Sequence, residues 1–412
     1  MTVSGPPAET GSAAPAATAA PTSLAGFGAL SCCYFAAVGL FNPYAPLWFQ
    51  SLGFSTILIG GISALQSWTR VFAPYAWSWA GDHSGRRVEL IRLAAVGSVL
   101  SAAGLLGVRG AAPVAAVTTL LFLANSGVVP LYEALLAHHL QTPQGIDGAR
   151  YGRVRMWGSV GFIASVTGFG VLLEWAGIGV FPIFVAAMNV LMLAVAWRLP
   201  TARDEARHAD PAPPVLPLLR RPEVAWFFAS VFFTVLAHSS LYAFFSLFLV
   251  SLGYGKAAVG ALWAVSVIVE ILFFWRQGPW FARFSAHRWL EVVALLTALR
   301  FAAMASAASW LLVLVLAQLA HAVTFAAHHA ACITLVTRFF PGRLRGRGQA
   351  LYTTLGYGLS GVLGGLGGGW LISQQGLTAV FWAASVAALI GWFCARLATR
   401  AAACADAADA SA

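Results

Sequence analysis

The sequence predicts an all-α membrane protein with twelve transmembrane helices in two six-helix bundles. Of its 412 residues, 59% are hydrophobic and 9% are charged, whereas soluble domains contain about 25% charged residues. From Leu24 onward, apolar stretches follow one another, and each is long enough to cross a hydrocarbon core of about 30 Å as a helix of roughly 20 residues. One long polar stretch divides this series at mid-chain.

The apolar stretches give the expected helices in chain order. Six lie before the polar stretch, at 25–50, 57–80, 88–108, 113–138, 156–177 and 178–199. Six follow it, at 223–252, 257–281, 288–308, 310–336, 349–373 and 378–396. The chain therefore divides into an N-terminal tail (1–24), a first bundle (25–200), a linker (201–222), a second bundle (223–397) and a C-terminal tail (398–412). The N-terminal tail is rich in Ala, Pro, Thr and Ser, which is typical of disordered segments.

The positions of the arginines predict the orientation in the membrane. Lys256 is the single lysine among 24 basic residues, and most arginines lie in alternate connections: Arg86 and Arg87; Arg150, Arg153 and Arg155; Arg198, Arg203, Arg207, Arg220 and Arg221; Arg283 and Arg288; Arg338, Arg343, Arg345 and Arg347. Because basic residues in short loops stay cytoplasmic, these connections and both termini are expected on the cytoplasmic side. The net charge of +10 then reflects topology, and no nucleic-acid partner is expected.

Glycine-rich segments occur at corresponding positions in the two bundles. The fifth helix contains GSVGFIASVTGFG (158–170) and the eleventh contains GYGLSGVLGGLGGGW (356–370). Small residues let helix backbones approach closely in a membrane, where lipid supplies no hydrophobic drive for association. We expect these glycines to serve close helix packing rather than flexibility.

Four charged residues stand inside the expected helices: Arg70, Glu133, Glu270 and Arg300. A charge at mid-helix costs roughly 2.5–3.5 kcal/mol, so four cost of order 10 kcal/mol unless they are paired or hydrated. The simplest pairing joins Glu270 to Arg300, and Glu133 to an arginine of the second or fifth helix. Purely structural ion pairs are the alternative, but such pairs stabilise less than well-packed apolar residues.

Histidines add a second group of polar residues within the helices. His321 and His328 are seven residues apart, so in an α-helix they share one face at a separation of about 10 Å. His329 is expected to point elsewhere, and His238 lies in the seventh helix. A metalloenzyme is disfavoured because no carboxylate or histidine accompanies them at i, i+3 or i+4. No phosphate-binding loop occurs either, and the sequence predicts neither a metal nor a cofactor.

The connection after the second helix reads AGDHSGRR (80–87). It resembles the loop motif of major facilitator transporters, G-x-x-x-D-[RK]-x-G-[RK]-[RK], with Ser78 in place of the leading Gly and His83 in place of the first basic residue. The resemblance implies that four residues latch one conformation of a transport cycle: Asp82, Gly85, Arg86 and Arg87. An ordinary arginine-rich cytoplasmic turn is the alternative.

Longer segments resemble the phenylpropionate permease family of the major facilitator superfamily. They are residues 237–275 across the seventh and eighth helices, HAVTFAAHHAA (321–331) and YGRVRMWGSVGF (151–162). The resemblance implies a monomeric proton symporter of the bacterial inner membrane, with its substrate bound near the bilayer midplane between the bundles. The expected partners are a small molecule, protons and lipid.

The segment YGRVRMWGSVG also resembles lactose permease-type proton symporters, in which it supplies a substrate-binding arginine, here Arg155, paired with the acid of LYEAL, here Glu133. The same resemblance implies a proton-coupling cluster of Glu270, Arg300, His321 and Glu133. This chain departs from the pattern at two places. Thr324 and Phe325 stand where an acid is expected, which leaves the proton-release site open, and Phe162 replaces a sugar-stacking Trp, which weakens a sugar as substrate.

These residues predict a coupling mechanism and a substrate class. Burial favours the protonated form of a carboxyl group and a nearby guanidinium favours the ionised form, so Glu270 is expected to alternate between a proton and Arg300, tuned by His321. Aromatic rings on the first helix (Tyr34, Phe41, Tyr44) and on the seventh (Tyr242, Phe244, Phe245) suit an aromatic carboxylate such as 3-phenylpropionate beside Arg70 or Arg155. The expected substrate-binding residues are Arg70, Arg155, Glu133, His238, Tyr242, His328, Tyr34 and Phe162.

Other functions stay open at this point. A nucleoside or an oligosaccharide is an alternative substrate, and a non-transporting membrane sensor could use the same scaffold. An enzyme is not expected.

Overall fold

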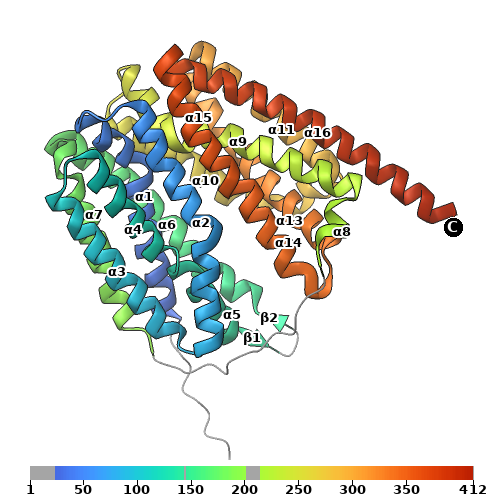
Figure 1. The fold of residues 1–412 in the computed structure, drawn as a ribbon, viewed down its shortest axis with the longest axis horizontal. Helices are drawn as coiled ribbons and strands as arrows, with labels where there is room; N and C mark the ends of the chain where they lie inside the picture. The colour runs from blue at the N-terminus through green and yellow to red at the C-terminus, as the bar shows by residue number, and fades with distance from the viewer. Residues whose placement is uncertain (1–23, 143–144, 201–213, 412) are drawn as a thin grey trace, which may run out of the picture.

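A computed structural model describes residues 24–142, 145–200 and 214–411. Most of the predicted N-terminal tail and of the linker at 201–222 lies outside these ranges. Within them the chain is helical apart from a two-residue hairpin of β1 (Gln141–Thr142) and β2 (Gly145–Ile146). Two helical bundles lie side by side, with the first half of the chain on the left of Figure 1 and the second half on the right.

The expected helices are present within the described ranges. The first bundle contains α1 (Ala25–Ser51), α2 (Thr56–Ser84), α3 (Arg87–Gly107), α4 (Ala111–Asn125), α5 (Val128–His139), α6 (Gly148–Ala176), η1 (Ile178–Val180) and α7 (Phe181–Trp197). The second contains α8 (Leu216–Leu219), α9 (Pro222–Ser251), α10 (Lys256–Phe281), α11 (Ala286–Ala307), α12 (Leu311–Leu319), η2 (Ala322–Ala327), α13 (His328–Phe339), η3 (Gly342–Leu344), α14 (Arg345–Leu351), η4 (Tyr352–Leu359), α15 (Ser360–Gln375) and α16 (Leu377–Ser411).

Several of these helices are consecutive pieces of one predicted transmembrane helix. The pair α4 and α5, the series α12, η2 and α13, and the series α14, η4 and α15 each form one crossing. The segments η2 and η4 are π-helical. In the described part of the chain, ten helices are long and apolar enough to cross a membrane. The other two crossings, α2 and residues 345–375, are less apolar, and they pack against each other between the bundles.

The last helix is longer than predicted. Its helical structure continues to Ser411, through most of the segment 398–412 that the sequence analysis assigned to a tail. The residues after the transmembrane part read TRAAACADAADAS, and alanine has the highest helix propensity of all residues. Intrinsic propensity therefore extends this helix beyond the apolar stretch.

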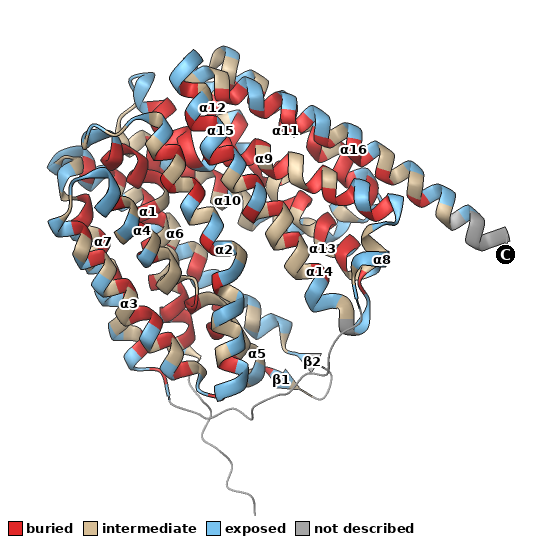
Figure 2. Ribbon diagram, in the orientation of Figure 1, coloured by how far each residue is buried: buried red, intermediate tan, exposed pale blue. Residues whose placement is uncertain are grey.

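Hydrophobic packing joins the bundles at one end and leaves them separate at the other. One buried cluster contains residues of both bundles, including Trp48, Val166, Phe244 and Trp263. A second cluster lies entirely in the first bundle and a third entirely in the second. Figure 2 shows buried residues inside each bundle and where the two bundles meet. We call the joined end, which carries the connections 52–55 and 252–255, the closed end, and the opposite end, which carries the arginine-rich connections, the open end.

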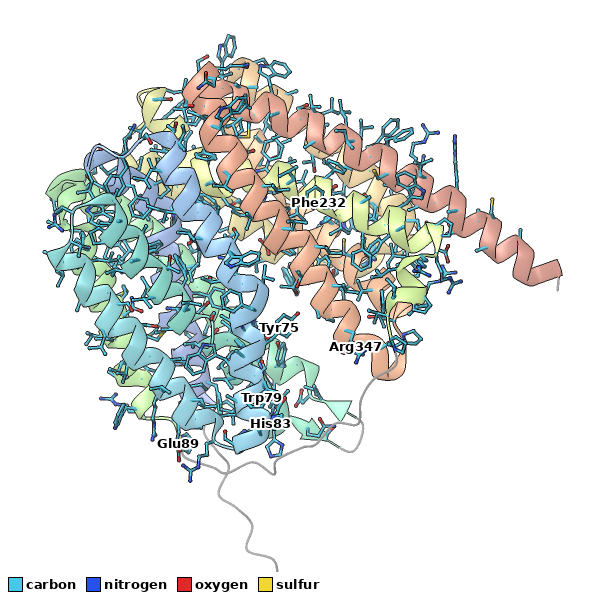
Figure 3. The ribbon with its side chains drawn as sticks, in the orientation of Figure 1. Tyr75, Trp79, His83, Glu89, Phe232 and Arg347 are labelled. Atoms are coloured by element: carbon cyan, nitrogen blue, oxygen red, sulfur yellow. The ribbon has the colours of Figure 1, made fainter. Side chains whose placement is uncertain are left out.

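Side chains at the open end confirm this asymmetry. On α2, Trp79 is 63% exposed and Tyr75 is 42% exposed. Figure 3 shows both on the lower part of α2, with Arg347 opposite on α14. The first part of α2 thus packs against α15, whereas side chains near the end of α2 are exposed.

Close backbone contacts hold the closed end together. A Cβ at Gly60 of α2 would collide with the carbonyl of Gly365 in α15, and a Cβ at Gly260 of α10 would collide with the carbonyl of Val166 in α6. The expectation that the glycine-rich segment of the eleventh helix serves packing is confirmed by Gly365. Two pairs of helices, α2 with α15 and α6 with α10, therefore seal this end.

Three polar contacts cross between the bundles at the same end. The Thr56 hydroxyl donates to the carbonyl of Gly369 at 3.1 Å. The Glu174 carboxylate accepts from the backbone N–H of Lys256 and so caps the first turn of α10, a position where a negative charge is stabilising. Buried Tyr44 donates to the carbonyl of Lys256 across the boundary at 3.4 Å, as well as to the carbonyl of Val166 in its own bundle at 2.6 Å. Tyr44 therefore belongs to the closed end, and its predicted place in an aromatic substrate slot is wrong.

Gly60 offers a test of this packing. Gly60→Leu should force α2 away from α15, because overpacking a tight contact costs about 1–3 kcal/mol. This cost corresponds to a change of roughly 5-fold to 150-fold in the population of the closed end. The readout is the labelling rate of Ser63→Cys, a cavity residue, by a membrane-impermeant maleimide added from the closed side, with the five native cysteines replaced by alanine. Gly61→Leu is the matched control, since a Cβ at Gly61 meets nothing within 4 Å. Equal labelling rates in the two variants would contradict the proposed seal.

Candidate functional site

Two neighbouring cavities lie between the bundles. The first has a volume of about 230 Å³ and is lined by both bundles, by Phe41, Gln66 and Arg70 on one side and by Tyr242, Phe325 and Tyr357 on the other. The second has a volume of about 470 Å³ and is lined mainly by the first bundle. Arg70, Gln66, Asn42, Phe41 and Phe122 line both cavities. The site is therefore a chamber whose walls carry both aromatic rings and polar side chains.

Arg70 is the charged group that the two cavities share. It is exposed, and it makes no hydrogen bond or ion pair with any residue in the described ranges. Beside it, the Gln66 side-chain amide donates to the Asn42 side-chain carbonyl at 3.1 Å. A guanidinium has five donors and no acceptor, so Arg70 presents a fork of unused donors to whatever occupies the chamber.

Glu133 and Arg155 form an ion pair within the first bundle. The Arg155 Nε lies 3.2 Å from the Glu133 Oε1, and both side chains are more than a third exposed. The Arg155 guanidinium also lies over the ring of Phe35, 4.5 Å from its centroid. The predicted pairing of Glu133 with an arginine of the second or fifth helix is confirmed, because Arg155 lies on α6, the fifth crossing.

Arg300 has neutral partners inside the second bundle. It is buried and donates to Thr324 Oγ1 at 2.9 Å, to His321 Nδ1 at 3.0 Å and to Gln318 Oε1 at 3.3 Å. Since a guanidinium can only donate, His321 Nδ1 accepts, and the proton of the neutral ring is on Nε2. The predicted ion pair between Glu270 and Arg300 is wrong for this conformation, because the helix rotations direct Arg300 toward α12 and η2.

Glu270 stands without a direct partner. It is half-buried on α10 and makes no hydrogen bond or ion pair with any described residue. The charge of Arg155, in the other bundle, acts on the Glu270 carboxyl group. Glu270 also interacts electrostatically with Tyr242 and Tyr357 of the first cavity. Arg155 therefore forms an ion pair with Glu133 and acts on Glu270 through its charge alone, at longer range across the interface.

The predicted histidines lie behind the chamber wall. His238 is buried, with Nδ1 2.8 Å from the Thr234 carbonyl and Nε2 without a partner in the described ranges, and its ring centroid lies 6.1 Å from that of His321. His328 is buried against Cys332, with 3.5 Å between Nε2 and Sγ. The expectation that His321 and His328 share one face does not allow for the π-helical segment η2 between them. A π-helix turns less per residue than an α-helix.

The predicted aromatic residues divide between the chamber and the core. Tyr34 lines the second cavity and Tyr242 the first. Phe162 lines neither of these cavities and packs beside Gly39. The expected slot residues Phe244 and Phe245 are also wrong, since both are core residues. Of the eight predicted substrate-binding residues, the four that line the cavities are Arg70, Glu133, Tyr34 and Tyr242.

Sequence reasoning missed several chamber residues. Asn42 and Gln66 are amide side chains inside apolar helices, and that signal could have found them. Phe325 and Tyr357 carry no comparable signal, since aromatic residues are common throughout the chain.

The four residues of the predicted latch lie at the open end. Arg87 Nη2 is 2.6 Å from Asp82 Oδ1, and Arg86 Nη1 is 3.5 Å from Glu89 Oε2. Gly85 caps α2 with a φ of 64°, in the left-handed region that favours glycine. Asp82 and Arg86 make their ion pairs within their own loop and the start of α3, and the role of this loop as a latch stays a prediction.

Comparisons with known proteins agree with this architecture. Residues 29–383 match the protein family described as MFS_1 like. The chain is 27% identical over 372 residues to a probable 3-phenylpropionic acid transporter of Escherichia coli (strain K12), covering 87% of this chain and 94% of that protein. It is 28% identical over 371 residues to a maltose permease of Geobacillus stearothermophilus, covering 87% of this chain and 90% of the permease.

Solved structures share the fold at low sequence identity. The crystal structure of a mutant of the nucleoside transporter NupG matches with a TM-score of 0.77 at 16% identity, covering 91% of this chain and 99% of that chain. The peptide transporter POT in complex with sulfate matches with a TM-score of 0.74 at 11% identity, covering 92% of this chain and 94% of that chain. They confirm the predicted major facilitator fold. The chain therefore belongs to the MFS_1 like family and is a secondary transporter of the major facilitator superfamily, which carries a small molecule across a membrane and is not an enzyme.

Proposed function

We propose that this transporter is a proton symporter that imports an aromatic carboxylate of the 3-phenylpropionate class across a bacterial inner membrane. The observation that carries the proposal is Arg70, a guanidinium without a described partner in a chamber lined in part by aromatic rings. A carboxylate can accept two parallel hydrogen bonds from one guanidinium. The aromatic ring of the substrate then contacts Phe41, Phe122 and Tyr242. The relative at 27% identity that is named a probable 3-phenylpropionic acid transporter supports the same substrate class.

Proton coupling is assigned to Glu270 and Arg155. A half-buried carboxyl group without a direct partner exchanges a proton readily when a cation moves toward or away from it. Arg155 lies in the first bundle and Glu270 in the second, so a relative movement of the bundles changes the distance between them. This proposal replaces Arg300, the cation expected from the sequence, with Arg155. One anionic substrate carried with one proton moves no net charge and draws on the pH gradient.

The described conformation is inward-facing if the arginine-rich connections lie in the cytoplasm. The open end carries those connections, including Arg345 and Arg347 before η4. Basic residues of short loops stay cytoplasmic. The closed end, with its glycine contacts, then faces outward, and the chamber releases its substrate into the cell.

A sugar is the second candidate substrate. It is favoured by the 28% identity to a maltose permease and by the paired amides of Asn42 and Gln66, which suit hydroxyl groups. An unpartnered Arg70 has no comparable use with a neutral sugar. Nucleosides and a non-transporting sensor have no specific observation in their favour.

Arg70 provides the test of substrate class. In proteoliposomes, labelled 3-phenylpropionate should be taken up, and Arg70→Gln should raise its KM by about 10-fold to 100-fold, the effect of losing a charged hydrogen bond worth roughly 1.5–3 kcal/mol. Arg109→Gln is the control, because Arg109 donates to backbone carbonyls of its own connection, including that of Val108 at 2.7 Å. Uptake of maltose but not of 3-phenylpropionate would replace the proposed substrate with a sugar.

Glu270 provides the test of coupling. Glu270→Gln should abolish accumulation driven by an inward pH gradient while leaving substrate exchange between the two sides intact, because exchange needs no net proton transfer. Glu89→Gln, which changes an exposed acid paired with Arg86, should retain accumulation. If accumulation survives in Glu270→Gln, coupling lies at another acid, and Glu133 is the next to replace.

A further inference from the structure

A chain of hydrogen-bonding side chains leads from the first cavity into the second bundle. Tyr357 lines the cavity, and its hydroxyl oxygen lies 3.2 Å from that of Tyr352. The Tyr352 hydroxyl in turn lies 3.0 Å from Nδ1 of His329 on α13. Three groups that can each donate and accept are thus connected in series between the chamber and the tenth crossing.

The π-helical segment η4 is what brings the two tyrosines together. In an α-helix, residues five apart point about 140° away from each other around the axis. In a π-helix the hydrogen bonds join residues five apart, so Tyr352 and Tyr357 lie one above the other. Their rings meet edge to face with centroids 5.5 Å apart. Segments of π-helix are rare and occur frequently at functional sites.

The series of hydrogen-bonding side chains from Tyr357 to His329 runs toward the open end. Tyr352 follows Arg347 by five residues, whereas Tyr357 lies deeper in the same crossing. His329 is half-buried. A side branch from Tyr352 reaches Cys332 and then His328, and it ends there because both residues are buried. His329 is therefore the far end of the chain.

Mutual satisfaction of buried polar groups is the simpler explanation of such contacts. It accounts for a hydroxyl pair, but it gives no reason for one end of the chain to line the chamber. Nor does it give a reason for the other end to be a half-buried imidazole, a ring that can accept a proton at one nitrogen and release one from the other.

We propose that Tyr357, Tyr352 and His329 form the path by which the coupled proton leaves the chamber. The proposal rests on the proposed function, in which Glu270 carries that proton. The Glu270 carboxylic acid gives its proton to the Tyr357 oxygen through an intervening water molecule and becomes a carboxylate. Tyr357 passes its own hydroxyl proton to Tyr352, and Tyr352 passes its own to Nδ1 of His329. Each hydroxyl gains one proton and loses one, and the imidazolium releases the proton from Nε2.

This path supplies a release site that the sequence left open. The expected acid after His321 is absent, and Thr324 at that place accepts a hydrogen bond from Arg300. The hydrogen-bond partners of Arg300 within the described ranges include no carboxylate. Proton release therefore needs another route, and the tyrosine chain begins at a residue that interacts electrostatically with Glu270.

The test measures proton movement and substrate exchange separately. Full-length protein is reconstituted with a pH-sensitive dye inside the vesicles, and substrate-driven proton influx is recorded beside counterflow of labelled 3-phenylpropionate. Tyr352→Phe and His329→Gln should each slow proton influx by about tenfold or more and leave counterflow within about twofold of the parent. Tyr254→Phe is the matched control, since it removes a hydroxyl that donates to the Ser309 carbonyl at the closed end.

The outcomes separate the path from the function on which it rests. Unchanged proton influx in both variants would overturn the path. Loss of influx and counterflow together in both would also overturn it, because the side chains would then be structural. If the parent protein carries substrate without moving protons, the proposed symport itself is wrong.

Discussion

The cost of placing charge in hydrocarbon organises this structure. A charged side chain inside a membrane must be paired, hydrated or satisfied by polar neighbours. Of the four charges predicted within the helices, Glu133 and Arg300 meet this requirement through neighbouring side chains. Glu133 and Arg155 pair directly, and Arg300 is surrounded by neutral acceptors inside its own bundle. Arg70 and Glu270 have no direct partner among the described residues, and both stand where the bundles face each other. The unsatisfied groups are thus a cation suited to an anionic substrate and an acid suited to a proton.

The closed end shows how two bundles can be held together and still be separable. Its contacts are van der Waals contacts of small residues, such as Gly60 against Gly365, together with three hydrogen bonds that involve backbone groups. In one of these the Glu174 carboxylate accepts from a backbone N–H. No ion pair between side chains of the two bundles is present in the described part of this end. Backbone and side-chain donors of this kind can exchange their partners for water when the end opens, so no buried charge is left without a partner.

The sequence predicted the features that depend on composition and missed those that depend on helix rotation. The apolar stretches predicted the crossings, and the cost of charge predicted that Glu133 pairs with an arginine of a neighbouring helix. The predicted ion pair between Glu270 and Arg300 was wrong because it assumed that adjacent helices direct their charged side chains toward each other. The sequence does not determine how each helix is rotated about its axis. The π-helical segments were missed for a related reason, since η2 and η4 leave the hydrophobic pattern unchanged. They alter which face His328 and Tyr357 occupy, and so the tyrosine chain could be found only in the structure.

In the proposed symport, the location of each charge relative to the bundle boundary decides which one can couple proton binding to movement. Arg300 and all three of its acceptors, Gln318, His321 and Thr324, lie in the second bundle, so rocking of the bundles as rigid bodies leaves these contacts unchanged. Arg155 and Glu270 lie in different bundles, and rocking changes the distance between them. A cation that approaches an acid favours its ionised form. Because Glu133 also binds Arg155, movement of Arg155 toward one acid weakens its hold on the other, and we infer that this competition, rather than the buried cluster at Arg300, links the conformation to the proton.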